Sequence, residues 1–186
     1  AVSGQVQKVD SIRFFTDEGL VQASLSTDLK QLQNESKQYF FQPASISFTF
    51  PDSTSYQEQI VAGARGKFRR GFCRIPPMML NFRGPGAPHL QSLGKLKLVI
   101  GCGQTVTDEE LLLKEYLVYK IYNLIDDRSF RVRLVRMNYT DTRNKIKPFS
   151  QYAFFLEDDA DMARRNGCQK KEEVKLLTEA TNRDMM

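Results

Sequence analysis

Histidine and cysteine are scarce in this sequence of 186 residues, which contains one histidine and three cysteines. Cys73, Cys102 and Cys168 lack the CxxC and Cys/His spacings of a zinc site, and three cysteines are too few for a scaffold built on disulfides. His89 lies in a loop rich in Gly and Pro without a second His or Cys near it, and such a histidine is usually just solvated. We therefore expect no metal site that depends on cysteine.

The three cysteines leave two alternatives open. Cys73 and Cys102 lie at the ends of neighbouring strand-like segments, so in an oxidising compartment they could form one disulfide and leave Cys168 free. Three buried thiols would fit the sequence equally well.

Long apolar runs and common phosphate-binding motifs are also missing. No segment reaches the roughly 18 to 20 apolar residues of a membrane span, so we expect no span. Neither GxxxxGK[ST] nor GxGxxG occurs, so no motif identifies a nucleotide site. With 41% apolar residues the chain can bury a substantial core, and we expect one compact domain.

Acidic residues are absent between Gln59 and Thr107, although the chain as a whole contains 22 of them. The same stretch contains eight basic residues: Arg65, Lys67, Arg69, Arg70, Arg74, Arg83, Lys95 and Lys97. Together with the formal net charge of +5, this asymmetry suits an anionic partner.

The segment from Arg65 to Arg74 combines two glycines with five of these cations. Glycine lets backbone N–H groups approach an anion closely, and guanidinium groups grip its oxygens, so the segment suits a phosphate. Two other interpretations remain: a solvated basic face, or a patch that docks onto the acidic cluster Glu157–Asp161 of the same chain.

Phenylalanines interleave with the cations, as they do in proteins that bind single-stranded nucleic acid. Phe68, Phe72 and Phe82 are explained more simply as core residues of strands. We therefore favour a phosphate-bearing small ligand over nucleic acid.

The hydrophobic pattern predicts an α+β fold. Apolar and polar residues alternate in several short segments, of which Ala44–Phe50 and Phe130–Tyr139 are the clearest. A capping box at Thr107–Glu110 begins a long helix that continues to Ile125 and is apolar on more than half of its circumference. We expect an antiparallel or mixed sheet of about six or seven strands, one long buried helix and a shorter second helix after Glu157.

The order of five segments resembles the N-terminal half of the spore-coat-protein-H-like (CotH) kinase family over roughly residues 44–168. The segments are RGKFRRGFCRIPPMMLNF, KLKLVIGC, LLLKEYLVYKIYNLI, SFRVRLVRMNY and YAFFLEDDADMARRNG. The resemblance implies a bacterial, exported protein with the fold of a kinase N-terminal lobe, and it implies ATP and Mg²⁺ as cofactors. Residues 1–18 would be a lead-in, residues 19–168 the nucleotide-binding-lobe-like domain, and residues 169–186 a helical tail that starts a second lobe.

The resemblance also implies roles for individual residues. Arg65, with Gly66 and Arg69, would face the ATP phosphates. Lys97, or Lys95 in its place, would be the strand lysine that holds them.

Two acids complete the implied site. Glu115 on the long helix would pair with the strand lysine, and Glu157 would lie at the hinge between lobes. Each acid has a structural alternative: Glu115 as a buried acid bonded to Arg or Tyr, Glu157 as a helix cap. Pro76 and Pro77 stand where the family commonly has a lysine pair.

The function expected from this resemblance is the binding of ATP phosphates without catalysis. The catalytic and metal-binding aspartates of such kinases belong to a second lobe, so the catalytic residues are not identified, and a protein substrate would be phosphorylated only if that lobe supplied them. The alternative is a non-catalytic extracytoplasmic module that binds an anionic partner through its basic surface.

Overall fold

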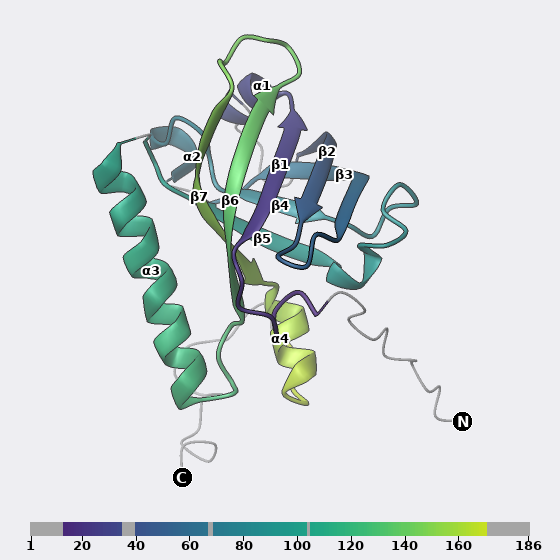
Figure 1. Ribbon diagram of the computed structural model, residues 1–186, viewed down its shortest axis with the longest axis vertical. Helices are drawn as coiled ribbons and strands as arrows, with labels where there is room; N and C mark the ends of the chain where they lie inside the picture. Colours follow the sequence, from purple (N-terminus) through teal and green to yellow (C-terminus); the bar gives the residue numbers. More distant parts are fainter. Residues whose placement is uncertain (1–12, 35–39, 67–68, 104, 171–186) are drawn as a thin grey trace, which may run out of the picture.

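The computed structural model describes residues 13–34, 40–66, 69–103 and 105–170, and seven strands form a closed barrel within them (Figure 1). The strands are β1 (Val21–Thr27), β2 (Phe41–Thr49), β3 (Ser55–Ala64), β4 (Met78–Asn81), β5 (Lys95–Ile100), β6 (Val132–Asp141) and β7 (Phe149–Glu157). The described helices are α1 (Leu29–Asn34), α2 (Arg69–Phe72), α3 (Val106–Ile125), α4 (Asp159–Arg165) and a short 3₁₀ turn at Gln91–Leu93.

The barrel closes because β6 pairs with β1. The strand order is β1-β2-β3-β4-β5-β7-β6, and every neighbouring pair is antiparallel except β1 and β6, which are parallel. The closing pair runs in continuous register from Val21 opposite Val135 to Thr27 opposite Asp141.

The expected kinase-lobe-like sheet is therefore wrong, and the described residues contain α1 and α2 in addition to the long helix and the shorter helix after Glu157. Alternating residues identify a strand with one buried face, but strands of an open sheet and of a barrel alternate in the same way. Closure depends on the pairing of β1 with β6, and no local pattern reports a pairing between segments so far apart in the chain.

Aromatic rings fill much of the barrel interior. Phe14, which precedes β1, is fully buried, and its ring centroid lies 5.6 Å from that of Phe48 and 5.5 Å from that of Phe155. The described end of the predicted lead-in thus contributes to the core. Residues 1–12 of that lead-in and residues 171–186 of the predicted tail lie outside the described residues.

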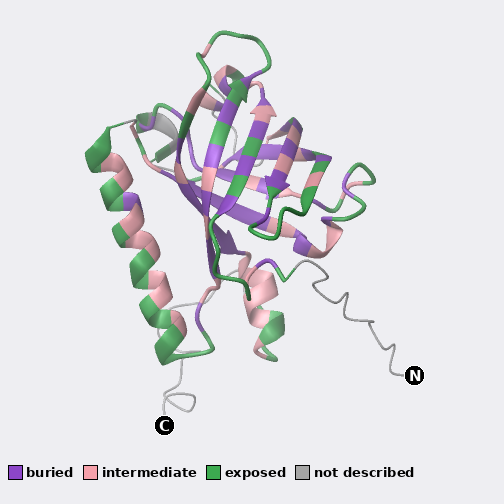
Figure 2. Ribbon diagram, in the orientation of Figure 1, coloured by how far each residue is buried: buried purple, intermediate pink, exposed green. Residues whose placement is uncertain are grey.

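Helix α3 lies on the outside of the barrel, against β6 and β7 (Figure 1). The expectation that it is buried is wrong, because Leu112 is its only buried residue and much of its surface is exposed in Figure 2. Tyr116 and Tyr119 pack beside Leu112 on Phe154 of β7, which gives the helix one packed face. An apolar sequence predicts burial, but it does not show whether a second layer is present to cover the other face.

The capping box of α3 lies two residues earlier than predicted. Thr105 accepts a hydrogen bond from the Asp108 N–H at 3.2 Å, and Asp108 accepts one from the Thr105 N–H at 3.2 Å. Both Thr105 and Thr107 are followed three residues later by an acid, so the sequence offers two equivalent boxes.

Asp141, at the end of β6, connects α1 to the loop between β6 and β7 through hydrogen bonds. Its buried carboxylate accepts backbone hydrogen bonds from Leu29 of α1 at 2.9 Å and from Lys145 and Ile146 of the following loop at 2.7 and 3.1 Å. Burial acts to raise the pKa of Asp141, but the donors from Lys145, Leu29 and Ile146 outweigh burial and lower it.

We expect Asp141→Asn to lower the free energy of unfolding by about 2 to 3 kcal/mol, because both carboxylate oxygens accept backbone N–H groups and an amide can accept on one side only. The lowered pKa adds a pH dependence: the stabilisation is present above about pH 4, where unfolded aspartate ionises, and is lost as the pH falls through the folded pKa. Urea unfolding at pH 7 and pH 3 measures both effects. Asp17→Asn, which removes an exposed ion pair with Arg13, should change stability by less than about 0.5 kcal/mol. An equal loss in both variants would contradict the role of Asp141.

Candidate functional site

A pocket rich in cations lies on the outer side of β5. Leu96 and Leu98 of this strand point into the barrel core, so Lys95 and Lys97 alternate to the outside. The pocket has a volume of about 490 Å³, within the range of small-ligand sites. We call it the basic pocket, and its lining residues are Phe41, Arg65, Gly66, Met79, Arg83, Lys95, Lys97, Asp158, Asp159, Ala160, Arg164 and Lys170.

Positive charge exceeds negative charge in the basic pocket. Six of its lining residues are Arg or Lys, and two are acids, Asp158 and Asp159. The six cations come from the segment after β3, from the region of β5 and from α4 and the residues after it, so the fold brings together charges that are distant in the sequence. This arrangement favours an anionic ligand.

Asp159 organises two of the pocket lysines. Lys97 forms an ion pair with Asp159, and Lys170 lies 3.4 Å from its other oxygen. Burial acts to raise the pKa of Asp159, but the hydrogen bonds and charges of Lys97 and Lys170 lower it, so the carboxylate stays ionised. The Lys97 ammonium also lies 4.8 Å from the ring centre of Phe130, which holds this nearly buried lysine from another side.

Other pocket cations are less constrained. Arg83 and Arg164 share Asp161, at 4.0 and 2.9 Å. Burial raises the pKa of Asp161 despite both guanidinium groups, so Asp161 is a weaker counter-ion than Asp159. Lys95 has no ion pair with any of the residues that the structure describes.

Gly66 gives the pocket an open backbone edge. Its φ of +86° is in the region that favours glycine, and apart from its chain neighbours no described residue has an atom within 4 Å of where a Cβ would be. The preceding residue is held in place, since the Arg65 N–H donates to the Pro77 carbonyl at 2.8 Å. A ligand can therefore approach the backbone at Gly66 without contact with a side chain of that residue.

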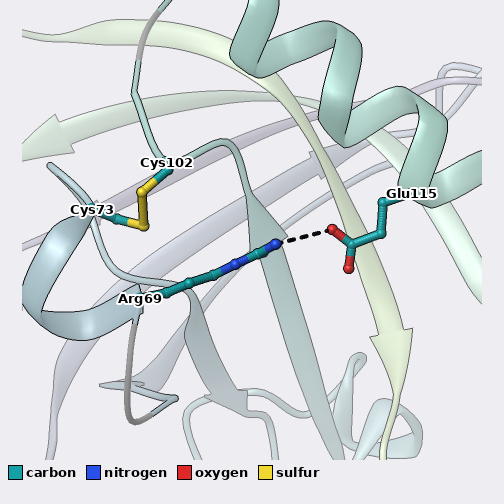
Figure 3. Close-up of a disulfide and its surroundings, with 4 residues drawn as sticks. All are labelled: Arg69, Cys73, Cys102 and Glu115. Carbon is teal, nitrogen blue, oxygen red and sulfur yellow. Dashed lines mark hydrogen bonds and ion pairs between the residues drawn. A yellow bond between two sulfur atoms is a disulfide. The ribbon is translucent and has the colours of Figure 1, made fainter.

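A second pocket, of about 350 Å³, shares Arg65 and Gly66 with the basic pocket. Its other lining residues are Arg69, Pro77, Val99, Glu115, Tyr119 and Leu156. Arg69 extends from α2 to Glu115 of α3, with 3.3 Å between Nη2 and Oε2 (Figure 3). The same figure shows the disulfide between Cys73 and Cys102, which fixes the end of α2 to the residue after Gly101.

The structure separates the six predicted site residues into three groups. Arg65, Gly66 and Lys97 line the basic pocket. Arg69 and Glu115 line the second pocket, to which Arg65 and Gly66 also belong. The expected pair of Lys97 with Glu115 does not form, because Lys97 pairs with Asp159 and Glu115 with Arg69.

Glu157 lines neither of these pockets. Its side chain is 1% exposed and accepts hydrogen bonds from Arg131 at 2.7 and 3.0 Å and from Arg165 at 3.1 Å. It does not cap α4, whose N-cap is Asp158. Glu157 therefore has a structural role in joining β6, β7 and α4.

Sequence reasoning missed the contribution of α4 and of the residues that follow it. Asp159, Arg164 and Lys170 follow β7, far in the sequence from the basic stretch, so the local density of charge does not indicate that they share a pocket with it. The cations that pair with this cluster, Lys97 with Asp159 and Arg83 with Asp161, lie outside the segment from Arg65 to Arg74 for which docking was considered, and Arg69 of that segment pairs with Glu115 instead. Lys67 and Phe68 of the basic stretch lie outside the described residues.

Another pocket, of about 430 Å³, lies beside the segment before β1. Among its lining residues are Arg13 and the acids Asp17 and Asp52, so its charge does not favour an anion. The described residues contain no cluster of three or more His, Cys, Asp or Glu side chains that could hold a metal ion. No described helix combines the length and apolarity that crossing a membrane requires.

Comparison with known proteins gives no relative for this chain. No family model, curated protein or solved structure matches it.

Proposed function

We propose that this chain binds the phosphate groups of a nucleotide, with ATP as the ligand, in the basic pocket. The observation that carries the proposal is the convergence of six cations around the open backbone of Gly66. Ammonium and guanidinium groups form charge-assisted hydrogen bonds with phosphate oxygens, and glycine has no side chain of its own to keep an anion from its backbone. The resemblance to CotH-like kinases supports a nucleotide, and the chain would then act as part of an atypical kinase or pseudokinase.

We expect Mg²⁺ to accompany ATP in the same pocket. Mg²⁺ is commonly held by one or two carboxylates together with substrate phosphates, and Asp158 and Asp159 are the two carboxylates that line the pocket. Asp158 also caps α4 through the Ala160 N–H at 3.0 Å, and Asp159 holds two lysines. Because the catalytic aspartates of such kinases belong to a second lobe, we propose binding without phosphoryl transfer.

The test is the affinity of Lys95→Ala for pyrophosphate and for ATP with Mg²⁺, measured by isothermal titration calorimetry. Lys95 is substituted in preference to Lys97 because Lys97 is nearly buried, and removing Lys97 would also take one ion-pair partner from Asp159. One charge-assisted hydrogen bond contributes about 1.5 kcal/mol, so the Kd should rise about tenfold. Lys147→Ala, in the exposed loop between β6 and β7, is the matched control and should change the Kd less than about twofold. Equal affinities in the wild type and Lys95→Ala would contradict the proposed site.

One observation favours the second candidate function, a non-catalytic extracytoplasmic module that binds an anionic polymer. The Cys73–Cys102 disulfide suits an oxidising compartment. Such a module would bind polyphosphate or a sulfated polysaccharide in preference to ATP, and its affinity would fall by similar factors in Lys95→Ala and Lys147→Ala because the contacts would be spread over the surface.

A further inference from the structure

Helix α3 has an exposed apolar face that nothing in the described residues covers. Eight large apolar side chains of this 20-residue helix are more than half exposed, among them Leu124 at 87% and Ile125 at 73%. The others are Val106, Leu111, Leu117, Val118, Ile121 and Tyr122. Isolated exposed apolar residues are ordinary, but a continuous patch of this size on one element marks an interaction surface.

The exposed face forms a stripe along the helix, on the side away from the barrel. Glu110, Lys114, Val118, Ile121 and Ile125 are spaced by three or four residues, so they follow one line on the helix surface. The residues that contact the barrel, Leu112, Tyr116 and Tyr119, belong to the opposite side. Figure 2 shows exposed residues along the whole length of α3.

The size of this face fits one side of a stable protein interface. A helix of 20 residues is about 30 Å long. Eight exposed side chains that each present on the order of 100 Å² give roughly 800 Å². A standard interface buries about 800 Å² from each partner.

The charges on the stripe indicate which partner would fit. Glu110 and Lys114 are exposed, have opposite signs and lie one turn apart, and neither forms an ion pair with another described residue. If a second copy of α3 packs antiparallel around a two-fold axis between these two turns, Glu110 faces the partner subunit's Lys114, and Lys114 faces the partner subunit's Glu110. Both charges are then paired at once, as a two-fold interface requires.

In this arrangement residues 106–118 of the two helices overlap, so the partner's α3 faces four of the eight exposed apolar side chains. The C-terminal half of α3, with Ile121 and Ile125, then extends past the start of the partner's α3. Phe72 at the end of α2 is also exposed, at 84%, and adjoins the disulfide that joins α2 to the segment before α3. We propose that the chain forms a two-fold dimer through antiparallel packing of α3, with reciprocal pairs between Glu110 and Lys114.

The experiment uses the full chain and sedimentation-velocity ultracentrifugation over about 1 to 100 μM, with circular dichroism to show that each variant is folded. The wild type should be dimeric. Lys114→Glu and Glu110→Lys should each weaken dimerisation at least tenfold, because each places like charges opposite one another across the axis. An equimolar mixture of the two variants should form a heterodimer with the affinity of the wild type, since both cross-axis pairs are then opposite in sign. Lys147→Glu, an equal change of charge in the exposed β6–β7 loop, should leave the dimer unchanged.

Several results would overturn the proposal. A wild-type chain that stays monomeric at 100 μM would mean that the face serves a different partner. A dimer that both charge variants leave intact would use another surface. A mixture that remains monomeric would show that Glu110 and Lys114 do not meet across a two-fold axis.

Discussion

Glu157→Gln should lower the free energy of unfolding by about 3 kcal/mol, the largest effect that we expect from a single substitution. The Glu157 carboxylate is nearly inaccessible and accepts from the guanidinium groups of both Arg131 and Arg165 and from the Arg131 N–H at 3.2 Å. Glutamine would turn an amide N–H₂ toward these donors, so at least one guanidinium group would lose its partner. Breaking a buried ion pair from one side costs about 3 to 5 kcal/mol, and the partial exposure of both arginines places this case at the lower end.

The measurement is urea unfolding at pH 7, with Asp127→Asn as the control. The Asp127 side chain is exposed, and its backbone lies near Arg165, whose Nη1 donates to the Asp127 carbonyl at 2.6 Å. That backbone bond is kept in Asp127→Asn, so the control should change stability by less than about 0.5 kcal/mol. A loss of less than 1 kcal/mol in Glu157→Gln would show that this buried triad does not stabilise the junction of β6, β7 and α4.

Removing the disulfide by the double substitution Cys73→Ser and Cys102→Ser should destabilise the protein by about 3 to 4 kcal/mol. The bond joins residues 29 positions apart, and the loss of chain entropy in the unfolded state for a loop of this length corresponds to about 3.5 kcal/mol. It also holds α2, and with it Arg69, near Glu115. Urea unfolding of the oxidised wild type and of the double variant gives the difference.

Cys168→Ser is the control for that substitution, because Cys168 is a free, exposed thiol and should contribute little to stability. A reducing agent should destabilise the wild type and leave the double variant unchanged. If the wild type unfolds at the same urea concentration with and without the reducing agent, the disulfide has no stabilising effect.

The parts of the fold that sequence could predict are those set by short-range patterns. The alternation of Ile46 and Phe48 with serines predicts the buried and exposed faces of β2, and the structure places Ile46 and Phe48 in the core. The start of α3 was missed by two residues because Thr105 and Thr107 offer equivalent caps. Barrel closure was not predictable, since it depends on the pairing of Val21 with Val135.

The candidate site shows the same division. Arg65, Gly66 and Arg69 are neighbours in the sequence, and their place beside the two pockets could be predicted from the density of charge. The partner of Lys97 could not, because Glu115 and Asp159 are both acids in nearby elements and only the position of α4 decides between them. The exposure of α3 could not be predicted either, because an apolar helix has the same sequence whether its outer face meets the same chain or another copy.

The binding of phosphate groups at Gly66 and Lys95 is the central claim, and a titration of the ¹⁵N-labelled chain with pyrophosphate, followed by NMR, tests it most directly. We predict saturable shifts of the backbone amides of Gly66, Lys95 and Asp159, around the basic pocket, with no saturable shifts of the amides of Asp52 and Thr54 in the pocket beside β1. Shifts that do not saturate, or that concentrate away from the basic pocket, would contradict the proposed function.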